Sequence, residues 1–318
     1  MKVSIVIPVY NSENSIGELV DVLVREFHDE TLEIILVNDG SRDNSHGVCL
    51  RKFEQHPGIV RYLQLARNFG EYNAVMAGLN HASGDYIITM DDDFQNPPAE
   101  ARRMLETMRQ GDYDVLYTYF GEKRHHWFRN FGSWFNDKVA TFLLEKPGDL
   151  YLSSFKCMNA FIVAEIIKYK GPYPFIDGLI LRATRNIGRL QVQHAERREG
   201  HSNYTLAKLI GVWLNMCTNF SVVPLRVSFF LGTLLTVFGV LLLLYFLLAI
   251  YWLQPEEFWP PGWPTLVVCI ITFSGTQLMI LGLLGEYLGK LFVSYNGRPQ
   301  YVVRRAHGDT SSKGNAGA

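Results

Sequence analysis

Cysteine is scarce in this chain of 318 residues, and neither sign of charge predominates. The cysteines, Cys49, Cys157, Cys217 and Cys269, lie too far apart in the sequence to show the spacing of a metal site, and they are typical of reduced cytoplasmic thiols. Because 30 basic and 31 acidic residues nearly balance, the composition gives no reason to expect a nucleic-acid partner. The chain also lacks a Gly-x-Gly-x-x-Gly segment after its first apolar run and a Walker sequence, so dinucleotide-binding and P-loop folds lose their main support.

Short apolar segments rich in β-branched residues alternate with amphipathic segments over the first 120 residues. The predicted strands are Val3–Ile7, Glu33–Val37, Val60–Leu65, Tyr86–Met90 and Asp114–Tyr119. The predicted helices are Ser15–Phe27, Ser45–Glu54, Glu71–His81 and Pro98–Arg109. This alternation predicts an α/β fold with a mainly parallel sheet flanked by helices. In such sheets, ligands bind beyond the carboxyl ends of the strands.

Three consecutive aspartates, Asp91 to Asp93, follow one of the predicted strands. Because side chains alternate along an extended segment, Asp91 and Asp93 can converge on one hard cation, Mg²⁺ or Mn²⁺, while Asp92 points elsewhere. Such a cation would bind a substrate diphosphate. The alternative is that the aspartates only cap the helix that begins near Pro98, although a cap needs one acceptor and not three carboxylates. Polar clusters end two other predicted strands, at residues 8–13 and 38–41, and one site could collect all three.

Two long uncharged segments predict a transmembrane hairpin. Phe229 to Leu253 contains 25 residues without a charge, about 37 Å as a helix, which exceeds the roughly 30 Å hydrocarbon core. Trp263 to Leu284 is a second segment of this kind. The connector from Gln254 to Gly262 has no Lys or Arg, whereas both flanks do, so the positive-inside rule places the flanks in the cytoplasm.

The hairpin divides the chain. We expect a cytoplasmic domain over 1–204, an interfacial helix over 205–227, two transmembrane helices within 228–289 and a cytoplasmic C-terminal tail over 290–318. The sequence thus predicts a multi-pass protein of the inner cell membrane, with both termini in the cytoplasm and the lipid bilayer as a partner. Gly285 and Gly289 would allow close helix contact or a homo-oligomer.

Six segments, in this order, resemble family 2 glycosyltransferases of the polyprenyl-phosphate type. They are IVIPVYNSENSI, ILVNDGSRDNS, LARNFGEYNAVMAGL, GDYIITMDDDFQNPP, HAERREGHSNY and LGLLGEYLGKLF. The group includes dolichyl-phosphate mannosyltransferases and undecaprenyl-phosphate sugar transferases, among them those acting on 4-deoxy-4-formamido-arabinose. The resemblance implies a glycosyltransferase A-type fold. It also implies inverting transfer of a sugar from a nucleotide-sugar, UDP favoured and GDP second, to a polyprenyl phosphate.

On the donor side, the resemblance places a nucleotide pocket and a metal motif on this sequence. The residues that match the nucleotide pocket are Pro8, Tyr10, Glu13 and Asp39. Asp39-Gly40-Ser41 is also a good turn followed by a helix cap, and both interpretations stay open. The metal and diphosphate motif, D-x-D-x-Q, is matched by Asp91, Asp93 and Gln95. The family's usual middle residue is Ala, so we expect the extra charge of Asp92 to be exposed.

On the acceptor side, HAERREGHSNY matches a family segment of the form R-x-x-G-x-S-K-Y. The resemblance makes four residues ligands of the lipid phosphate: Arg197, Arg198, Ser202 and Tyr204. Asn203 stands where the family commonly has Lys, and Arg198 can replace that cation. Alternatively, the two arginines form solvated ion pairs with neighbouring glutamates. Residues 206–223 read as an interfacial helix, and residues 123–144 read as a second one or as a core helix.

The implied chemistry is attack by the acceptor phosphate on the anomeric carbon. Many inverting relatives place a carboxylate where this chain has Ser154, but a phosphate monoester with a second pKa near 6 is already anionic. Ser153, Ser154 and Lys156 are further candidates for contacts with sugar or phosphate, and Asp177 is a candidate for a base or for a contact with a sugar hydroxyl, although it can also be an ordinary loop acid. Two other functions stay open: an inactive membrane-bound nucleotide-sugar sensor, and a glycosyltransferase with a non-lipid acceptor. A processive synthase is disfavoured, because no Q-x-x-R-W segment is present and two helices make no pore.

Overall fold

The computed structural model of the chain describes residues 1–120, 150–193, 262–295 and 299–308, together with 230, 232–234, 237–239, 241 and 244. The chain divides into two compact units. One comprises Met1–Asn203 and Gly297–Ala318, and the other comprises Tyr204–Asn296.

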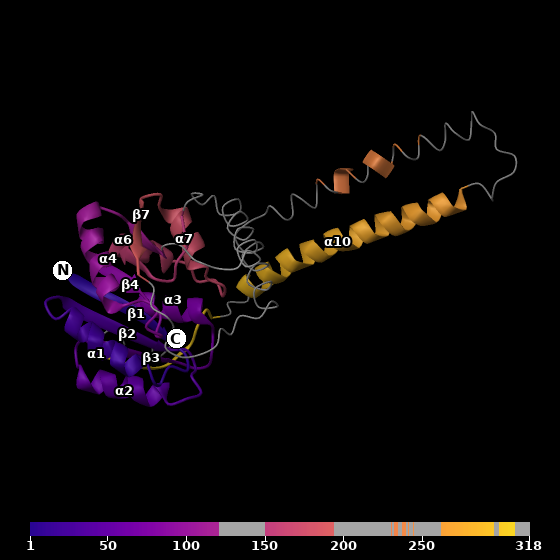
Figure 1. Cartoon of the computed structure of the whole chain (residues 1–318). Helices are drawn as coiled ribbons and strands as arrows, with labels where there is room; N and C mark the ends of the chain where they lie inside the picture. The colour runs from indigo at the N-terminus through magenta and orange to yellow at the C-terminus, as the bar shows by residue number, and fades with distance from the viewer. Residues whose placement is uncertain are drawn as a thin grey trace. The chain divides into compact units, whose positions relative to one another are not determined.

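In the first unit, eight strands formed by described residues make one sheet with helices on both faces (Figure 1). The strands are β1 (Lys2–Val9), β2 (Thr31–Asn38), β3 (Val60–Leu65), β4 (Tyr86–Thr89), β5 (Val115–Phe120), β6 (Lys156–Asn159), β7 (Ile187–Val192) and β8 (Val303–His307). The helices are α1 (Ile16–Glu26), α2 (Ser45–Gln55), α3 (Glu71–His81), α4 (Pro98–Gly111), α6 (Ala160–Ile166) and α7 (Ile176–Ala183).

The strand order is β7-β5-β6-β4-β1-β2-β3-β8. Strands β1 to β4 run parallel, and so do β5 and β7, whereas β6 runs antiparallel to β4 and β5, and β8 runs antiparallel to β3. The predicted α/β class with a mainly parallel sheet flanked by helices is therefore confirmed. Each strand and helix predicted within the first 120 residues is present, with ends within two residues of the prediction.

The core lies on both faces of the sheet because central parallel strands are covered on both sides. Alternate residues of β1 show this directly. Ile5 and Ile7 belong to the apolar cluster that packs under α1, α2 and α4, while Val6 belongs to the cluster under α3, α6 and α7. All three side chains are fully buried. This double cover fixes the strands, and with them the loops that leave their carboxyl ends.

Strand β8 lies in the segment that we expected to be a C-terminal tail. It joins the sheet edge instead, with His307 opposite Tyr62 and Ala306 opposite Leu63. The sequence Val303-Arg-Arg-Ala-His307 has no alternation of apolar and polar residues, so only its partner strand makes it a strand.

The second unit contains α10 (Trp263–Tyr295), a helix of 33 residues that begins where the second membrane segment was predicted to begin. A Cβ added to Gly232 would lie 3.3 Å from Ile280, and one added to Gly239 would lie 3.1 Å from Phe273. These contacts are seven residues apart in both segments and run in opposite order, so the two segments pack antiparallel. By length and hydropathy together, none of the helices formed by described residues qualifies as membrane-spanning. Most of the first predicted span, 229–253, lies outside the described residues, and so do residues 123–144 and 206–223.

Candidate active site at the carboxyl edge of the sheet

The loops that follow β1 and β2 are tied together by hydrogen bonds. The backbone N–H of Asn11 donates to Ser41 Oγ at 3.1 Å, and the N–H of Ser12 donates to Ser45 Oγ at 2.8 Å. In return, the N–H of Arg42 donates to Asn11 Oδ1 at 2.8 Å. These side chains satisfy backbone donors that have left the sheet ladder. Two of the three predicted polar clusters therefore lie together.

Glu13 and Tyr10 occupy different positions in the first of these loops. Glu13 Oε2 accepts from the N–H of Asn44 at 2.8 Å, and the N–H of Glu13 donates to Asp43 Oδ2 at 3.0 Å, so this glutamate links the two loops. The Tyr10 side chain is 42% exposed and available for stacking. Pro8 lies within β1. Contact of these residues with a nucleotide stays a prediction.

Asp39 holds the loop that precedes α3. Its carboxylate is buried and accepts from the N–H of Phe69 at 2.7 Å and of Gly70 at 2.9 Å. Burial raises the pKa of Asp39, and the two hydrogen bonds act in the opposite direction. Gly40 lets the turn approach this loop closely, since its φ is 68° and an added Cβ would lie 2.6 Å from the backbone N of Asn68. Asp39 thus joins the ends of β2 and β3.

Asp92 ties the loop after β4 to the loop after β1. Its Oδ2 accepts from the N–H of Tyr10 at 3.1 Å and from the hydroxyl of Ser12. The expectation that Asp92 would be exposed is wrong, because these bonds draw the side chain inward and leave it partly buried. Burial raises the pKa of Asp92 to about 6, and the negative charges of Asp91 and Asp93 act in the same direction. The third polar cluster therefore joins the other two.

Asp91 and Asp93 flank this contact. Asp91 Oδ2 accepts from Ser154 Oγ at 2.9 Å and lies 3.4 Å from the amide nitrogen of Asn96. Asp93 Oδ1 accepts from the N–H of Gln95 at 3.1 Å. Phe94, between Asp93 and Gln95, has a φ of 61°. This conformation is unfavourable for a bulky residue and recurs at functional sites.

The carboxylates fit a divalent cation whose remaining ligands come from water and a substrate. Among the described residues, no group of three or more His, Cys, Asp or Glu is arranged to hold a metal by itself. Mg²⁺, however, is usually bound through one or two carboxylates, with water and substrate phosphates as the other ligands. Burial is the main cause of the raised pKa of Asp92, and the neighbouring carboxylates Asp91 and Asp93 add to it, so a cation held between those two carboxylates would offset their negative charge.

A buried ion pair lies beside the acidic loop. Thr89 Oγ1 donates to the backbone oxygen of Ser154 at 2.6 Å, and Thr89 faces Lys156 in the β4–β6 ladder. The ammonium of Lys156 pairs with Asp177, in the first turn of α7, whose Oδ1 also accepts from Tyr117 Oη at 2.8 Å. All three residues are at most 5% exposed. Asp177 is thus occupied by a structural contact rather than placed as a base.

Glu71, the first residue of α3, was not among the predicted site residues. Desolvation by the surrounding protein and the negative charge of Asp91 raise its pKa to about 7, although the Lys156 ammonium acts in the opposite direction. Glu71 is exposed, so it lies at the border of the site and not in its interior. The rule that ligands bind beyond the carboxyl ends of strands could have found Glu71, because the loop 66–70 that follows β3 leads directly into it.

The predicted ligands of the lipid phosphate, Arg197, Arg198, Ser202 and Tyr204, lie outside the described residues. Their assignment stays a prediction from the sequence.

Comparison with known proteins places this site in a family. The profile described as "Glycosyl transferase family 2" matches residues 4–164. The undecaprenyl-phosphate 4-deoxy-4-formamido-L-arabinose transferase of Serratia proteamaculans (strain 568) is 34% identical over 314 residues, covering 97% of this chain and 94% of the relative. The enzyme of the same name from Photorhabdus laumondii subsp. laumondii is 34% identical over 321 residues, covering 99% and 97%.

Among solved structures, the chain is similar to glucosyl-3-phosphoglycerate synthase from Mycobacterium tuberculosis in complex with Mn²⁺, UDP-glucose and phosphoglyceric acid. The TM-score is 0.51 at 17% identity, and the match covers 69% of this chain and 78% of that one. At this identity the likeness shows a shared fold, which agrees with the glycosyltransferase A-type fold that the resemblance implied. The chain belongs to glycosyl transferase family 2.

Proposed function

We propose that the protein transfers a sugar from a UDP-sugar to undecaprenyl phosphate, or a similar polyprenyl phosphate, at the cytoplasmic face of the inner membrane. The observation that carries this proposal is identity of 34% over nearly the whole chain to transferases named for undecaprenyl phosphate. In the reaction, a lipid phosphate oxygen bonds to the anomeric carbon from the face opposite the leaving group, the bond from that carbon to the diphosphate breaks, and UDP departs.

Asp91 and Asp93 would hold a Mg²⁺ or Mn²⁺ ion, which would neutralise charge on the departing diphosphate. Asp92 is committed to the loop after β1, so we assign it to holding the site together. Gln95 follows in the same loop, and its N–H orients Asp93. Glu71, at the start of α3, borders the same carboxylates, and desolvation together with the negative charge of Asp91 raises its pKa.

No side-chain base is needed for this transfer. Ser154 stands where many relatives carry a carboxylate, and here its hydroxyl donates to Asp91. Asp177 is buried in its pair with Lys156. The acceptor phosphate, with a second pKa near 6, carries its own negative charge at cytoplasmic pH. Inversion then depends on positioning and on charge neutralisation.

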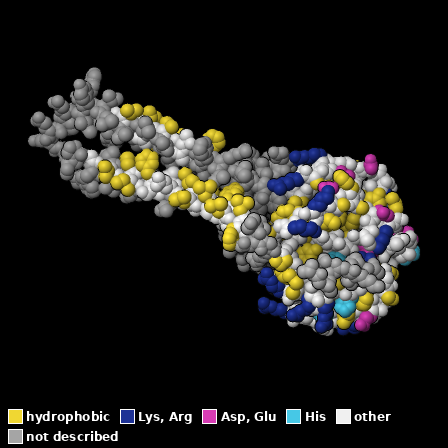
Figure 2. Space-filling model, turned by 180° about the vertical axis from the view of Figure 1, so that it is seen from behind, with side chains coloured by type: hydrophobic (Ala, Val, Ile, Leu, Met, Phe, Trp, Pro, Cys, Tyr) yellow, Lys and Arg dark blue, Asp and Glu magenta, His cyan; other side chains and the backbone are white. Residues whose placement is uncertain are grey.

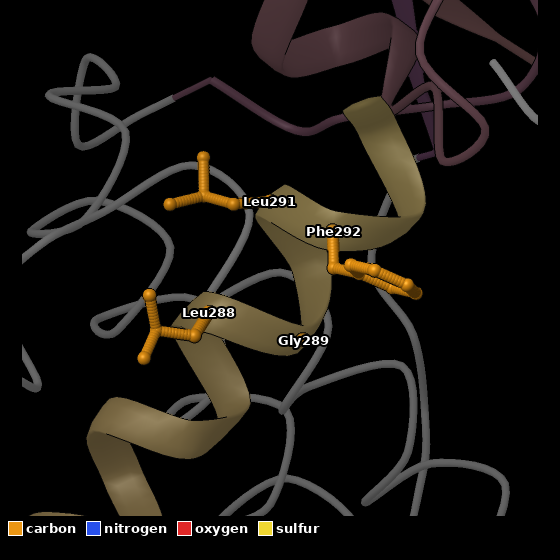
Figure 3. A pocket seen from close by; sticks show the side chains of 4 residues that line it. All are labelled: Leu288, Gly289, Leu291 and Phe292. Carbon is orange, nitrogen blue, oxygen red and sulfur yellow. The ribbon is translucent and has the colours of Figure 1, made fainter. Parts of the chain in front are cut away.

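The surface of α10 supports the membrane part of the proposal. Large apolar side chains on it, including Leu281, Leu288, Leu291 and Phe292, are 62% to 66% exposed. Figure 2 shows such hydrophobic side chains along this unit. Leu288, Gly289, Leu291 and Phe292 line an open hollow of about 660 Å³, and Leu288 and Leu291 project to the same side (Figure 3). Exposed apolar surface of this kind suits lipid acyl chains.

The test is a transfer assay with purified full-length protein, undecaprenyl phosphate and a panel of labelled UDP- and GDP-sugars in the presence of Mg²⁺ or Mn²⁺. The proposal predicts that label from one UDP-sugar partitions into organic solvent, and only when the lipid is present. Donor binding without any product would favour the sensor alternative. Label that enters a water-soluble product would favour a non-lipid acceptor.

A further inference from the structure

The hydroxyl of Tyr62 lies in a buried polar network between the C-terminal strand and the proposed donor site. Tyr62 is in the middle of β3 and is fully buried. Its hydroxyl lies 2.7 Å from Nδ1 of His46 and accepts from Nδ2 of Asn38 at 3.2 Å. Because Asn38 donates, the single hydroxyl hydrogen is free to point at Nδ1 of a neutral His46, and both bonds form together. Burial raises the pKa of Tyr62 above its ordinary value, so the hydroxyl keeps its proton.

Asn38 passes this contact on to the turn that contains Asp39. Asn38 is the last residue of β2 and is 2% exposed. While its amide nitrogen donates to Tyr62, its Oδ1 accepts from the N–H of Ser41 at 2.9 Å. Ser41 Oγ in turn accepts from the N–H of Asn11, in the loop after β1. One amide side chain thus connects β3 to both loops of the proposed nucleotide pocket.

The cover over Tyr62 comes from the far end of the chain. His307 of β8 faces Tyr62 in the ladder, and the two rings stack with centroids 5.8 Å apart at an interplanar angle of 16°. Phe53 of α2 packs against the same imidazole, with ring centroids 5.6 Å apart. Strand β8 follows α10 in the sequence, so the sheet edge that encloses Tyr62 is completed only after the chain has passed through the helical unit.

A merely space-filling role does not account for these contacts. Tyr62 belongs to an apolar cluster, where a phenylalanine would fill the same volume without any buried polar partner. A buried polar network is favourable only when its members are satisfied, and it then specifies one geometry. Here the geometry that it specifies is the position of Asn38 and of the turn at Ser41.

We propose that Tyr62 is a positioning residue for donor binding: its hydroxyl, enclosed by His307 of the C-terminal strand, fixes Asn38 and through it the turn that carries Asp39. This inference rests on the proposed function, because it takes the turn to be part of the site for a nucleoside diphosphate. It links the affinity for the donor to the docking of a strand that lies beyond α10 in the sequence.

The test compares Tyr62→Phe with the wild type in the full-length protein. UDP affinity in the presence of Mg²⁺ is measured by calorimetry, and kcat and both KM values are measured in the transfer assay. Loss of the hydroxyl bond is expected to raise the Kd for UDP and the donor KM about tenfold. We expect kcat and the lipid KM to stay within about twofold of wild type, since the reacting groups do not contact Tyr62. Tyr86→Phe makes the same change at the amino end of β4, whereas the proposed site lies beyond the carboxyl end of that strand. It is the matched control and should bind UDP as the wild type does.

His307 supplies the second arm of the test. His307→Phe keeps a ring on Tyr62 and should retain UDP affinity, whereas His307→Ala should weaken it several-fold. Wild-type UDP affinity in Tyr62→Phe would overturn the inference. A parallel loss of kcat, lipid KM and thermal stability in that variant would also overturn it, because the effect would then be general damage to the fold. If the wild-type protein itself binds no UDP, the donor assignment fails, and the positioning role fails with it.

Discussion

Replacing Asp39 by asparagine tests whether one buried carboxylate holds the loop before α3. The wild-type carboxylate accepts two backbone hydrogen bonds, from Phe69 at 2.7 Å and from Gly70 at 2.9 Å. In Asp39→Asn, the amide oxygen can keep one of these bonds, but the amide nitrogen then faces the other N–H, donor against donor.

The expected magnitude follows from these two contacts. A hydrogen bond to a charged group contributes about 1.5 to 3 kcal/mol, and an unpaired buried N–H costs about 1 to 3 kcal/mol. Part of this loss is offset, because burial raises the pKa of Asp39 and a neutral amide avoids the desolvation that the carboxylate suffers. We expect the closed loop to be destabilised by about 1.4 to 2.8 kcal/mol, which corresponds to about tenfold to hundredfold more frequent opening.

Hydrogen exchange followed by mass spectrometry measures this opening. The amides of Phe69 and Gly70 should exchange about tenfold to hundredfold faster in Asp39→Asn, while the buried interior of α3, residues 74–79, should be unchanged. Asp29→Asn is the control, because Asp29 forms an exposed pair with Arg102, and such pairs contribute only about 0 to 1 kcal/mol. Unchanged exchange at residues 69 and 70 in Asp39→Asn would refute the reasoning that this carboxylate closes the loop.

Three further predictions concern charge, acceptor and topology. The pKa of Asp92 is raised from 3.8 to about 6, so between these pH values the folded state binds more protons than the unfolded state. The stability of the protein in EDTA should therefore fall as the pH rises from about 4 to about 6, and the thermal midpoint of Asp92→Asn should depend less on pH. Identical pH profiles of the two proteins would contradict the assignment. Arg197→Ala should strongly lower turnover with polyprenyl phosphate and leave donor affinity nearly unchanged. Arg197→Lys should recover part of the turnover, since Lys keeps the charge but lacks the paired donors of the guanidinium group. Wild-type kinetics in the alanine variant would refute the assignment of Arg197 to the acceptor phosphate. A cysteine placed at Gln254 should react with an impermeant reagent from outside intact cells while one at Ser311 is protected, and the reverse pattern would refute cytoplasmic catalysis.

The strands and helices of the first 120 residues could be predicted because their local pattern and their burial agree. β1 and β2 contain the apolar runs 5–9 and 34–37, which are covered on both faces of the sheet. The buried apolar residues of α1 recur at helical spacing, at Ile16, Leu19, Val20 and Leu23. Since parallel strands end at one edge, the meeting of the loops after β1, β2 and β4 also followed from the sequence.

What could not be predicted depends on partners that are distant in the sequence. Lys156 is buried because Asp177 neutralises it, and no local pattern reveals that pairing. The inward position of Asp92 depends on donors in the loop after β1, 80 to 82 residues away. Strand β8 is a strand only because β3 offers it an edge, and its Val-Arg-Arg-Ala-His sequence has no strand pattern of its own.

The central claim is that the acidic loop after β4 drives sugar transfer to a polyprenyl phosphate. Its most direct test is the rate at which labelled sugar from a UDP donor enters undecaprenyl phosphate, measured side by side for the wild type, Asp91→Asn, Asp93→Asn and Asp92→Asn. We predict that the wild type forms the lipid-linked sugar, that the variants at 91 and 93 lose almost all activity while staying folded, and that Asp92→Asn retains most of it, because an amide oxygen can still accept from Tyr10 and Ser12. Normal turnover in Asp93→Asn, or an equal loss in all three variants, would contradict the account.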